Sequence, residues 1–347
     1  MSVGVTDLVQ FLISGLLQGG FFALASVGLT LIFGVQRILN VAQGAFIVLA
    51  SFLTFQFSII LTPMWHLDPL FSILLDFVVL GAVGGVSYLV LIYRIENTGF
   101  EAPLLATFGL SIFLEYVVTN GLSFAIPLGS RVFHLALLPQ LNPTGAEGVQ
   151  VENTALPNAS FNVGPFVIQE AILIAFILAI VLIPLLHVFL TKTYFGRAIR
   201  ATSQDQEAAE FSGINVRLMR FISFSLGSSL AGVAGGIYVF TSPVTATAGD
   251  EYLLPFMLAV IIIGGVGSML GTLLGGFIIG LILSVSDFVV FEVIAGVSVP
   301  KDLGSVIAFL FFLVVLMVRP NGLFGNVANK RGIFRNPTKT GAKIETK

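Results

Sequence analysis

Long apolar runs alternate with short polar stretches along almost the whole chain. Most of these runs are long enough to cross the roughly 30 Å of hydrocarbon in a bilayer as a helix. The pattern therefore predicts an all-α, polytopic membrane protein with about nine transmembrane helices, within a range of about eight to ten. The runs cover residues 8–35, 41–62, 69–93, 103–126, 165–191, 218–240, 253–268, 270–290 and 303–318.

The boundary between the seventh and eighth runs is ambiguous. Glycines interrupt the apolar segment Ile261–Gly280, so it forms either two spans with a tight turn near Gly267–Gly271 or one re-entrant element. Irregular backbone is not tolerated against lipid, so we expect any break there to be packed inside the protein. Elsewhere glycines recur at spacings of four, as at Gly15 and Gly19, which favours close helix packing.

Composition supports a membrane protein and excludes several other classes. The chain is 56% hydrophobic and 10% charged, and its mean hydropathy is +1.02. It has no cysteine, which excludes disulfides and thiolate metal sites, and its three histidines are scattered. The net charge of -2 does not indicate nucleic acid. We expect no metal, no bound cofactor and no nucleic-acid partner.

The positions of lysine and arginine predict which side of the membrane each loop occupies. The tail at 326–347 is strongly basic and is therefore expected in the cytoplasm. With nine spans, Arg37, Arg94 and the basic residues of 192–217 fall on that same side, and the N-terminus lies outside. Arg131 and Lys301 are the exceptions.

These assignments divide the chain into one transmembrane domain over 1–325 and the basic cytoplasmic tail at 326–347. The segment 127–164 is rich in proline, asparagine and glycine, and is predicted to be an irregular extracytoplasmic loop. The first ten residues contain Asp7 but no lysine or arginine, so the first run is interpreted as a retained span rather than a cleaved signal.

One polar stretch stands apart, GRAIRATSQDQEAAEFSGINVRLMR at Gly196–Arg220, which holds seven charged side chains. A short cytoplasmic helix is predicted here, with Ser203 as its N-cap, acids in its first turn and Gly213 just after its end. Its apolar side is small and is formed by Ala208, Ala209 and Phe211. Such a helix suits a groove on another protein, although a plain solvated loop is the alternative.

A few polar residues lie within the apolar runs, where they are costly in lipid. The acids are Asp76, Glu115 and Asp287. Glu115 shares a helix face with Ser111 and Thr119, and forms either an interhelical hydrogen bond or part of a transport path.

Asn40 and Gln43 are spaced as in a capping box at the start of the second span, with a place on the transport path as the alternative. The acidic pair Asp250–Glu251 falls at another span start, where acids favour a helix N-terminus.

The sequence contains no pattern expected of an enzyme. There is no Gly-x-x-x-x-Gly-Lys-[Ser/Thr] segment, so no phosphate-binding loop for ATP. No Ser/His/Asp set and no usefully spaced pair of carboxylates is evident. We therefore expect a transport subunit without an ATPase site of its own.

Four segments, in order, resemble the permease subunits of branched-chain amino acid importers of the ATP-binding-cassette (ABC) class. They are RILNVAQGAFIVLASFL, FGRAIRATSQDQEAAEFSGINV, IIGGVGSMLGTLLGGFIIG and VRPNGLFG, within a similarity that covers roughly 8–325. The chain is most similar to the first of the two paired permeases. Gln43 stands where that family usually has histidine, and 127–164 is longer than usual. Both departures leave the substrate open, since urea and short-chain amide importers use similar permeases.

The resemblance implies a set of partners and a site. EAAEFSG matches the family's Glu-Ala-Ala-x-x-x-Gly motif, which forms the coupling helix that docks on the ATPase subunit. The implied partners are a second permease, two cytoplasmic ATP-binding subunits, which use the ATP, and an extracytoplasmic binding protein, in a prokaryotic plasma membrane. The expected coupling residues are Glu207, Ala208, Ala209 and Gly213, with Arg197 and Arg200, which either contact the ATPase or only follow the positive-inside rule.

Two further functions stay open beside import of hydrophobic amino acids. The first is a urea or short-chain amide importer of the same class. The second is an ion-coupled secondary transporter, which would rely on the buried acids Glu115, Asp76 and Asp287. Candidates for the translocation path are Asn40, Gln43 and Glu115.

Overall fold

The chain is helical over almost all of the residues described by the computed structural model, which are 5–65, 68–95, 99, 101–121, 160–289, 303–319 and 322–323. Most of the predicted loop 127–164 and the whole predicted tail 326–347 lie outside these residues. The elements are α1 (Val5–Gln36), α2 (Gln43–Trp65), the 3₁₀ turn η1 (Pro69–Phe71), α3 (Ser72–Ser87), the π-helical turn η2 (Tyr88–Ile92), α4 (Tyr93–Ile95), α5 (Glu101–Tyr116), the π-helical turn η3 (Val117–Gly121), β1 (Ser160–Val163), β2 (Phe166–Gln169), α7 (Glu170–Lys192), α8 (Tyr194–Gln204), α9 (Gln206–Phe211), α10 (Val216–Thr241), the π-helical turn η4 (Gly249–Leu253), α11 (Leu254–Gly264), α12 (Met269–Phe288) and α13 (Leu303–Val318).

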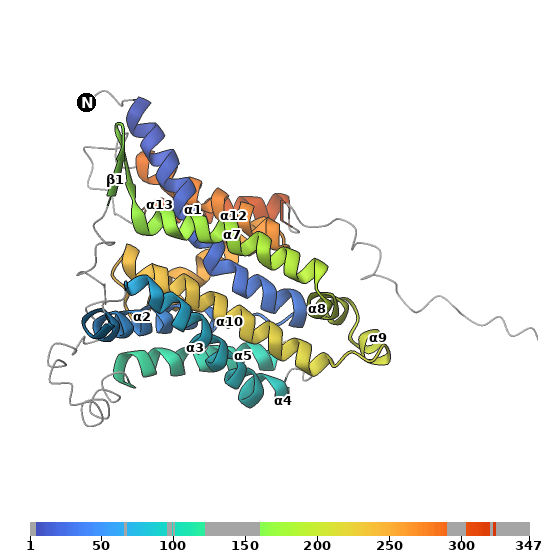
Figure 1. Ribbon diagram of the computed structural model, residues 1–347. Helices are drawn as coiled ribbons and strands as arrows, with labels where there is room; N and C mark the ends of the chain where they lie inside the picture. Colours follow the sequence, from blue (N-terminus) through green and yellow to red (C-terminus); the bar gives the residue numbers. More distant parts are fainter. Residues whose placement is uncertain are drawn as a thin grey trace, which may run out of the picture.

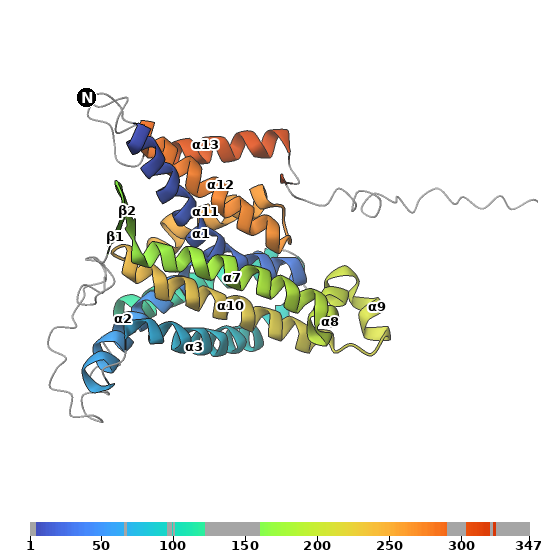
Figure 2. The same cartoon turned by 45° about the horizontal axis from the view of Figure 1, so that its top comes forward.

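The long helices form one bundle (Figure 1). The β1–β2 hairpin lies at one end, which we name the hairpin end, and α8 and α9 lie at the other, which we name the α9 end. Figure 2 shows α12 and α13 on one side of α1, with α3 and α10 on the other.

Six helical segments of the described chain are long and apolar enough to cross a membrane. They are Thr6–Gln36, Pro69–Ile95, Glu101–Thr119, Glu170–Lys192, Val216–Thr241 and Met269–Phe288. Shorter apolar helices cover Gln43–Ser58 and Gly304–Val318. A polytopic helical membrane protein is therefore confirmed, whereas nine spans and the orientation of the termini stay predictions.

Helices α1 and α10 form the centre of the bundle, where most of their side chains are buried. In contrast, α3, α5 and α7 keep much of their apolar surface exposed, as expected of helices that face lipid. Leu or Ile is equally suitable in both places, because lipid tails are as apolar as a protein core. Hydropathy therefore predicts that these segments are helices but not which ones are central.

Glycines determine where the central helices approach one another. A Cβ at Gly276 of α12 would meet the backbone of α1 at Gly19 and Ala23 at 2.6 Å. A Cβ at Gly28 of α1 would likewise overlap the carbonyl of Gly227 in α10. The predicted packing role of the glycine series is confirmed at these contacts, because only the missing side chain allows the backbones so close.

The ambiguous segment at 253–290 is two helices joined by a tight turn. Helix α11 ends at Gly264, and α12 begins at Met269 after a turn in which Gly265 (φ 88°) and Gly267 (φ 80°) take left-handed conformations. The turn is covered by the chain after α13, where the Leu323 amide donates to the Ile263 carbonyl at 2.8 Å. This packing supplies the protein surroundings that irregular backbone at a membrane requires.

The fifth apolar run was expected to be helical from residue 165, and this boundary is wrong. Phe166–Gln169 is a strand that pairs with Ser160–Val163 in antiparallel register. The left-handed Gly164 (φ 63°) and Pro165 form a turn, so the helix cannot begin until Glu170. The Gln10 side chain fixes the hairpin to α1 by bonding both the amide and the carbonyl of Val167, at 3.0 and 2.8 Å.

Candidate functional site

The polar stretch between α7 and α10 folds into two consecutive helices at the α9 end. Thr193 caps α8 by accepting a hydrogen bond from the Gly196 amide at 3.0 Å. Asp205 is extended (φ -151°, ψ 114°), which ends α8, and its carboxylate caps α9 by accepting from the Ala208 amide at 3.0 Å. The predicted N-cap was Ser203, which is wrong, because Ser203 lies inside α8 and donates to the Arg200 carbonyl.

Helix α9 ends at Phe211, just before the glycine that the sequence predicts as its stop. Gly213 has φ 80°, and its amide donates to the Glu210 carbonyl at 2.9 Å. The next amide, of Ile214, donates to the Ala209 carbonyl at 3.0 Å. Nothing lies within 4 Å of a Cβ at Gly213, so the left-handed backbone and not crowding favours glycine here.

The structure brings the predicted coupling residues together at this tip. Glu207 and Ala208 are exposed on α9, whereas Ala209 is buried with 3% exposure and holds the helix to the body. Arg197 and Arg200 are exposed on the neighbouring α8. Phe211, which was expected to share an apolar face with the alanines, is 92% exposed at the end of α9. A large apolar side chain so fully exposed is a candidate contact for another protein.

A cavity of about 400 Å³ separates this tip from the end of α1. Arg37, Ser203, Gln204 and Glu207 are among the residues that line it. Arg37 directly follows α1 and is left-handed (φ 55°), a conformation that is rare for a residue with a side chain. The α8–α9 unit therefore has space beside it at the point where the chain turns from α1 toward α2.

The second group of predicted residues lies deep inside the bundle, where α2 begins. Gln43 and Asn40 are both fully buried. The Gln43 side-chain amide donates to the Gly227 carbonyl, near the middle of α10, at 3.2 Å. The Asn40 side-chain amide donates to the Gln43 side-chain oxygen at 3.1 Å. Helix α2 thus starts well inside the membrane-spanning bundle and not at its surface.

The predicted capping box is wrong at this position. In a capping box the Asn40 side-chain oxygen would accept from the Gln43 amide, but that amide donates to the Asn40 backbone carbonyl at 3.2 Å. The Asn40 Oδ1 has no partner in the described part of the chain. Thr107 of α5 holds the preceding loop instead, by accepting from the Val41 amide at 3.3 Å and donating to the Leu39 carbonyl at 3.2 Å.

A second irregular stretch meets the start of α2. The turn η4 brings Gly249 against Gly44 so closely that a Cβ on either residue would overlap the other's backbone. Ser111 of α5 donates to the Asp250 carboxylate, 2.7 and 2.9 Å from its two oxygens. We name Asn40, Gln43, Ser111 and Asp250 the polar junction. Sequence reasoning interpreted Asp250 only as an acid at a helix start and missed its contact with α5.

Glu115 lies one helical turn beyond Ser111, close to Asp250 and Glu251. Its carboxylate makes no hydrogen bond with the described residues, so the expected interhelical bond through this side chain is not found, and Thr119 donates to the Glu115 backbone carbonyl. The side chain is partly exposed. Partly exposed acids within the membrane-spanning part are costly unless protein or water covers them.

The other two acids in apolar runs have separate surroundings. Asp76 of α3 is fully buried, accepts a hydrogen bond from Thr54 of α2 and lies against Gly232 and Gly236 of α10. Asp287 is exposed near the hairpin end of α12 and lies against Gly304 of α13. No group of three or more His, Cys, Asp or Glu side chains that could hold a metal ion occurs among the described residues.

Comparison with known proteins covers nearly the full chain. A family described as "Branched-chain amino acid transport system / permease component" matches residues 11–316. The chain is 27% identical over 313 residues to the probable branched-chain amino acid transport permease protein LivH of Methanocaldococcus jannaschii, covering 89% of this chain and 90% of that protein. It is also 27% identical over 335 residues to the high-affinity branched-chain amino acid transport system permease protein BraD of Pseudomonas aeruginosa, covering 91% and 95%.

A shorter stretch is similar to a sugar permease. The chain is 38% identical over 104 residues to the ribose import permease protein RbsC of Bacillus subtilis, which covers 28% of this chain and 32% of that protein. No solved structure matches the chain. Full-length similarity therefore extends to the proteins named for branched-chain amino acids, and only a part of the chain is similar to the ribose protein.

Proposed function

Because this chain belongs to the family of permease components of branched-chain amino acid transport systems, we propose that it is the membrane-spanning subunit of an ABC importer. The importer would move branched-chain or other hydrophobic amino acids into a prokaryotic cell. The observation that carries the proposal is α9. It is a short helix, capped at both ends and exposed at one end of the bundle, and it carries the Glu-Ala-Ala-x-x-x-Gly motif.

Coupling to ATP hydrolysis is proposed to pass through this helix. One of the two cytoplasmic ATP-binding subunits would contact Glu207, Ala208 and Phe211, with Arg197 and Arg200 beside them. Ala209 is buried, and only the short connection 212–215 separates α9 from α10, so a push on α9 would be carried into the bundle. The chain's lack of a phosphate-binding loop fits a subunit whose energy comes from its partners.

A second permease is proposed to cover the acids beside the polar junction. Glu115 and Glu251 are partly or fully exposed in this chain alone, at a place where lipid contact would be costly. A paired permease would enclose them in a water-filled path along Asn40, Gln43 and Glu115. Irregular backbone such as that before α2 and η4 is typical of membrane proteins where it lines such a path. An extracytoplasmic binding protein would deliver the substrate.

Two alternatives remain distinct from this proposal. Gln43, in place of the histidine usual in the family, leaves urea or a short amide as the substrate, and competition of these compounds with leucine for the binding protein distinguishes them. An ion-coupled secondary transporter is favoured only by the acids Glu115, Asp76 and Asp287. It predicts uptake driven by a proton or sodium gradient with no ATP-binding subunit present.

The test is a charge reversal on α9 in the complete importer. We expect Glu207→Lys to lower ATP-dependent leucine uptake by about tenfold or more, because a contact that transmits force is replaced by repulsion worth several kcal/mol. Co-purification of the ATP-binding subunits should fall in parallel. Uptake into vesicles and subunit stoichiometry measure the two effects.

A matched control separates coupling from folding. Glu101 is also an exposed acid in the first turn of a helix, α5, so Glu101→Lys makes the same change away from α9. It should leave uptake and subunit association near normal, with both variants equally abundant in the membrane. Normal uptake by Glu207→Lys would remove α9 from the coupling mechanism.

A further inference from the structure

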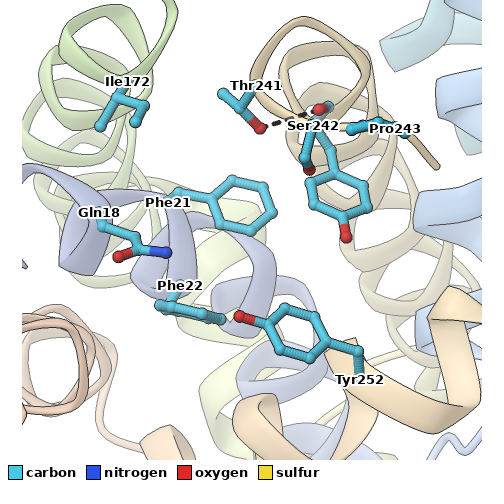
Figure 3. A pocket seen from close by; sticks show the side chains of 9 residues that line it. Gln18, Phe21, Phe22, Ile172, Thr241, Ser242, Pro243 and Tyr252 are labelled. Carbon is cyan, nitrogen blue, oxygen red and sulfur yellow. Dashed lines mark hydrogen bonds between the residues drawn. The ribbon is translucent and has the colours of Figure 1, made fainter. Parts of the chain in front are cut away.

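A cavity of about 330 Å³ lies near the hairpin end, between α1, α7, α10 and η4 (Figure 3). We name it the aromatic cavity, because four of its lining residues are Phe21, Phe22, Tyr238 and Tyr252. It is separate from the α9 tip, which lies at the opposite end of the bundle. Tyr252 belongs to η4, the same turn whose Asp250 contacts α5 on the polar junction side.

Packing holds the aromatic walls in place. The Phe21 ring is stacked on Tyr238, with ring centroids 5.3 Å apart and 15° between the planes. Phe22 is 1% exposed and packs against Tyr252 at 6.4 Å. Tyr252 in turn contacts Phe256 of α11 at 4.9 Å. Rigid apolar walls of this kind bind an aliphatic group with little loss of conformational entropy.

One end of the aromatic cavity is formed by the C-terminal end of α10. Thr241, Ser242 and Pro243 line it, and the Ser242 amide closes the last turn by donating to the Tyr238 carbonyl at 3.2 Å. Pro243 has no amide hydrogen, so the Val239 carbonyl receives no helical donor from it. The partial negative charge of a helix C-terminus favours a cation, such as an ammonium group, at this place.

The N-terminal end of α7 reaches the same cavity. Ile172, the third residue of α7, lines it, and the N-cap residue Gln169 gives no side-chain hydrogen bond to the first turn. Glu170 is the acid of that turn, and it does not line the cavity. Amide groups at a helix N-terminus favour an anion such as a carboxylate. The two helix ends therefore present opposite partial charges to one cavity.

Polar side chains add donors and acceptors inside the aromatic cavity. The side-chain amide of Gln18 makes no hydrogen bond with the described residues. Figure 3 shows Gln18 and Tyr252 extending toward one another from opposite walls, with Phe22 between them. A mainly apolar cavity with a few convergent polar groups is the usual form of a small-molecule site.

We infer that the aromatic cavity binds the transported substrate within the permease, as a zwitterionic α-amino acid with a small aliphatic side chain. The aliphatic side chain packs against Phe21 and Phe22, the ammonium group lies at the end of α10, and the carboxylate lies near the start of α7 and Gln18. The inference rests on the proposed function and adds a site in the half of the bundle that is predicted to face outward.

The absence of natural cysteine makes a protection experiment direct. Ser242→Cys places one thiol at the cavity in the complete permease complex, without the binding protein, and N-ethylmaleimide modifies it. Leucine should slow the modification by about tenfold at about ten times its Kd. Urea should give no protection. Ser160→Cys, at an exposed hairpin position that does not line the cavity, should react at the same rate with and without leucine.

Each other outcome has a definite meaning. If the complex takes up leucine with ATP but leucine never protects Ser242→Cys, the inference is overturned and the proposed function stands. If the complex takes up no leucine at all, the proposed function itself fails. Equal protection by urea overturns the zwitterion assignment. Protection that depends on bilayer lipid and not on leucine identifies a lipid chain as the occupant, which also overturns the inference.

A filling substitution provides a second, independent measurement. The side chain of Ile172→Trp should fill the aromatic cavity and leave no room for leucine. We therefore expect ATP-dependent leucine uptake to fall by about tenfold or more. Ile180→Trp makes the same change two turns along α7, where the side chain is 42% exposed on the outer surface. Unchanged uptake in Ile172→Trp, with both variants assembled, contradicts the inference.

Discussion

At the scale of single residues, α9 depends on how the chain enters and leaves it. Asp205 ends α8 and caps α9 in one step, since its extended backbone breaks the first helix while its carboxylate satisfies an amide of the second. Gly213 ends α9 with a left-handed backbone. The tip is held at both ends, and Glu207, Ala208 and Phe211 on its outer surface are exposed among the described residues, which suits a surface that another protein must find preformed.

Gly213→Ala tests the backbone requirement alone. A Cβ would meet nothing within 4 Å, so the expected cost of about 1–2 kcal/mol comes from the left-handed conformation. Amide hydrogen exchange of α9 should accelerate accordingly. Gly109→Ala is the control, because a Cβ there also meets nothing within 4 Å, while its helical backbone suits alanine. Equal exchange of α9 in the two variants would show that the end of α9 needs no glycine.

At the scale of elements, glycines allow helices to pack closely, and side chains at the irregular segments make polar contacts between elements. Helix α1 packs on α12 through Gly19 and Gly276 and on α10 through Gly28 and Gly227. Where α2 and η4 meet, Gly44 and Gly249 touch, and their neighbours Gln43 and Asp250 bond to α10 and α5. Movement of α2 or of η4 therefore changes the contacts with both α5 and α10.

Gly276→Val should destabilise the packing of α1 on α12. The added side chain overlaps Gly19 and Ala23, and overpacking of this kind costs about 1–3 kcal/mol or more. We expect a lower Tm and a lower yield of folded protein in detergent. Leu274→Val introduces the same residue on the exposed side of α12, where the side chain is 40% exposed, and should leave the Tm nearly unchanged. A similar Tm for both variants would contradict the close contact.

At the scale of the whole molecule, the two ends of the bundle carry different features. The hairpin and the aromatic cavity lie toward one end, and α8 and α9 lie at the other. Basic residues predict that the α9 end is cytoplasmic. With that orientation, substrate would enter at the hairpin end, and the ATP-driven motion would begin at the α9 end. The polar junction would lie between the two ends.

Thiol labelling measures this orientation directly, since the chain has no cysteine of its own. Ser160→Cys in the hairpin and Phe211→Cys on α9 are both exposed positions. A membrane-impermeant reagent added outside right-side-out vesicles that lack the ATP-binding subunits should modify Ser160→Cys at once, and Phe211→Cys only after permeabilisation. The reverse order would invert the predicted topology.

Much of the candidate site can be predicted from the local sequence. Helix ends are decided by residues within one turn, so Gly213 marked the end of α9 correctly. The N-cap was placed at Ser203 and not at Asp205 because both are good caps, and only the break between two helices distinguishes them. Asn40 and Gln43 were recognised as a pair, but their partner Gly227 is 184 residues from Gln43, and no local pattern points to it.

The sequence alone determined that this protein is a helical membrane protein, and where its polar tip lies, because hydropathy and capping act over short distances along the chain. The tertiary structure decided which helices are central, that α2 begins inside the bundle, and that Asp250 reaches Ser111 across 139 residues. It also assembled the aromatic cavity from four separate elements. Those features depend on which helices pack together, and an apolar side chain is equally stable against lipid or another helix, so hydropathy carries no signal for that choice.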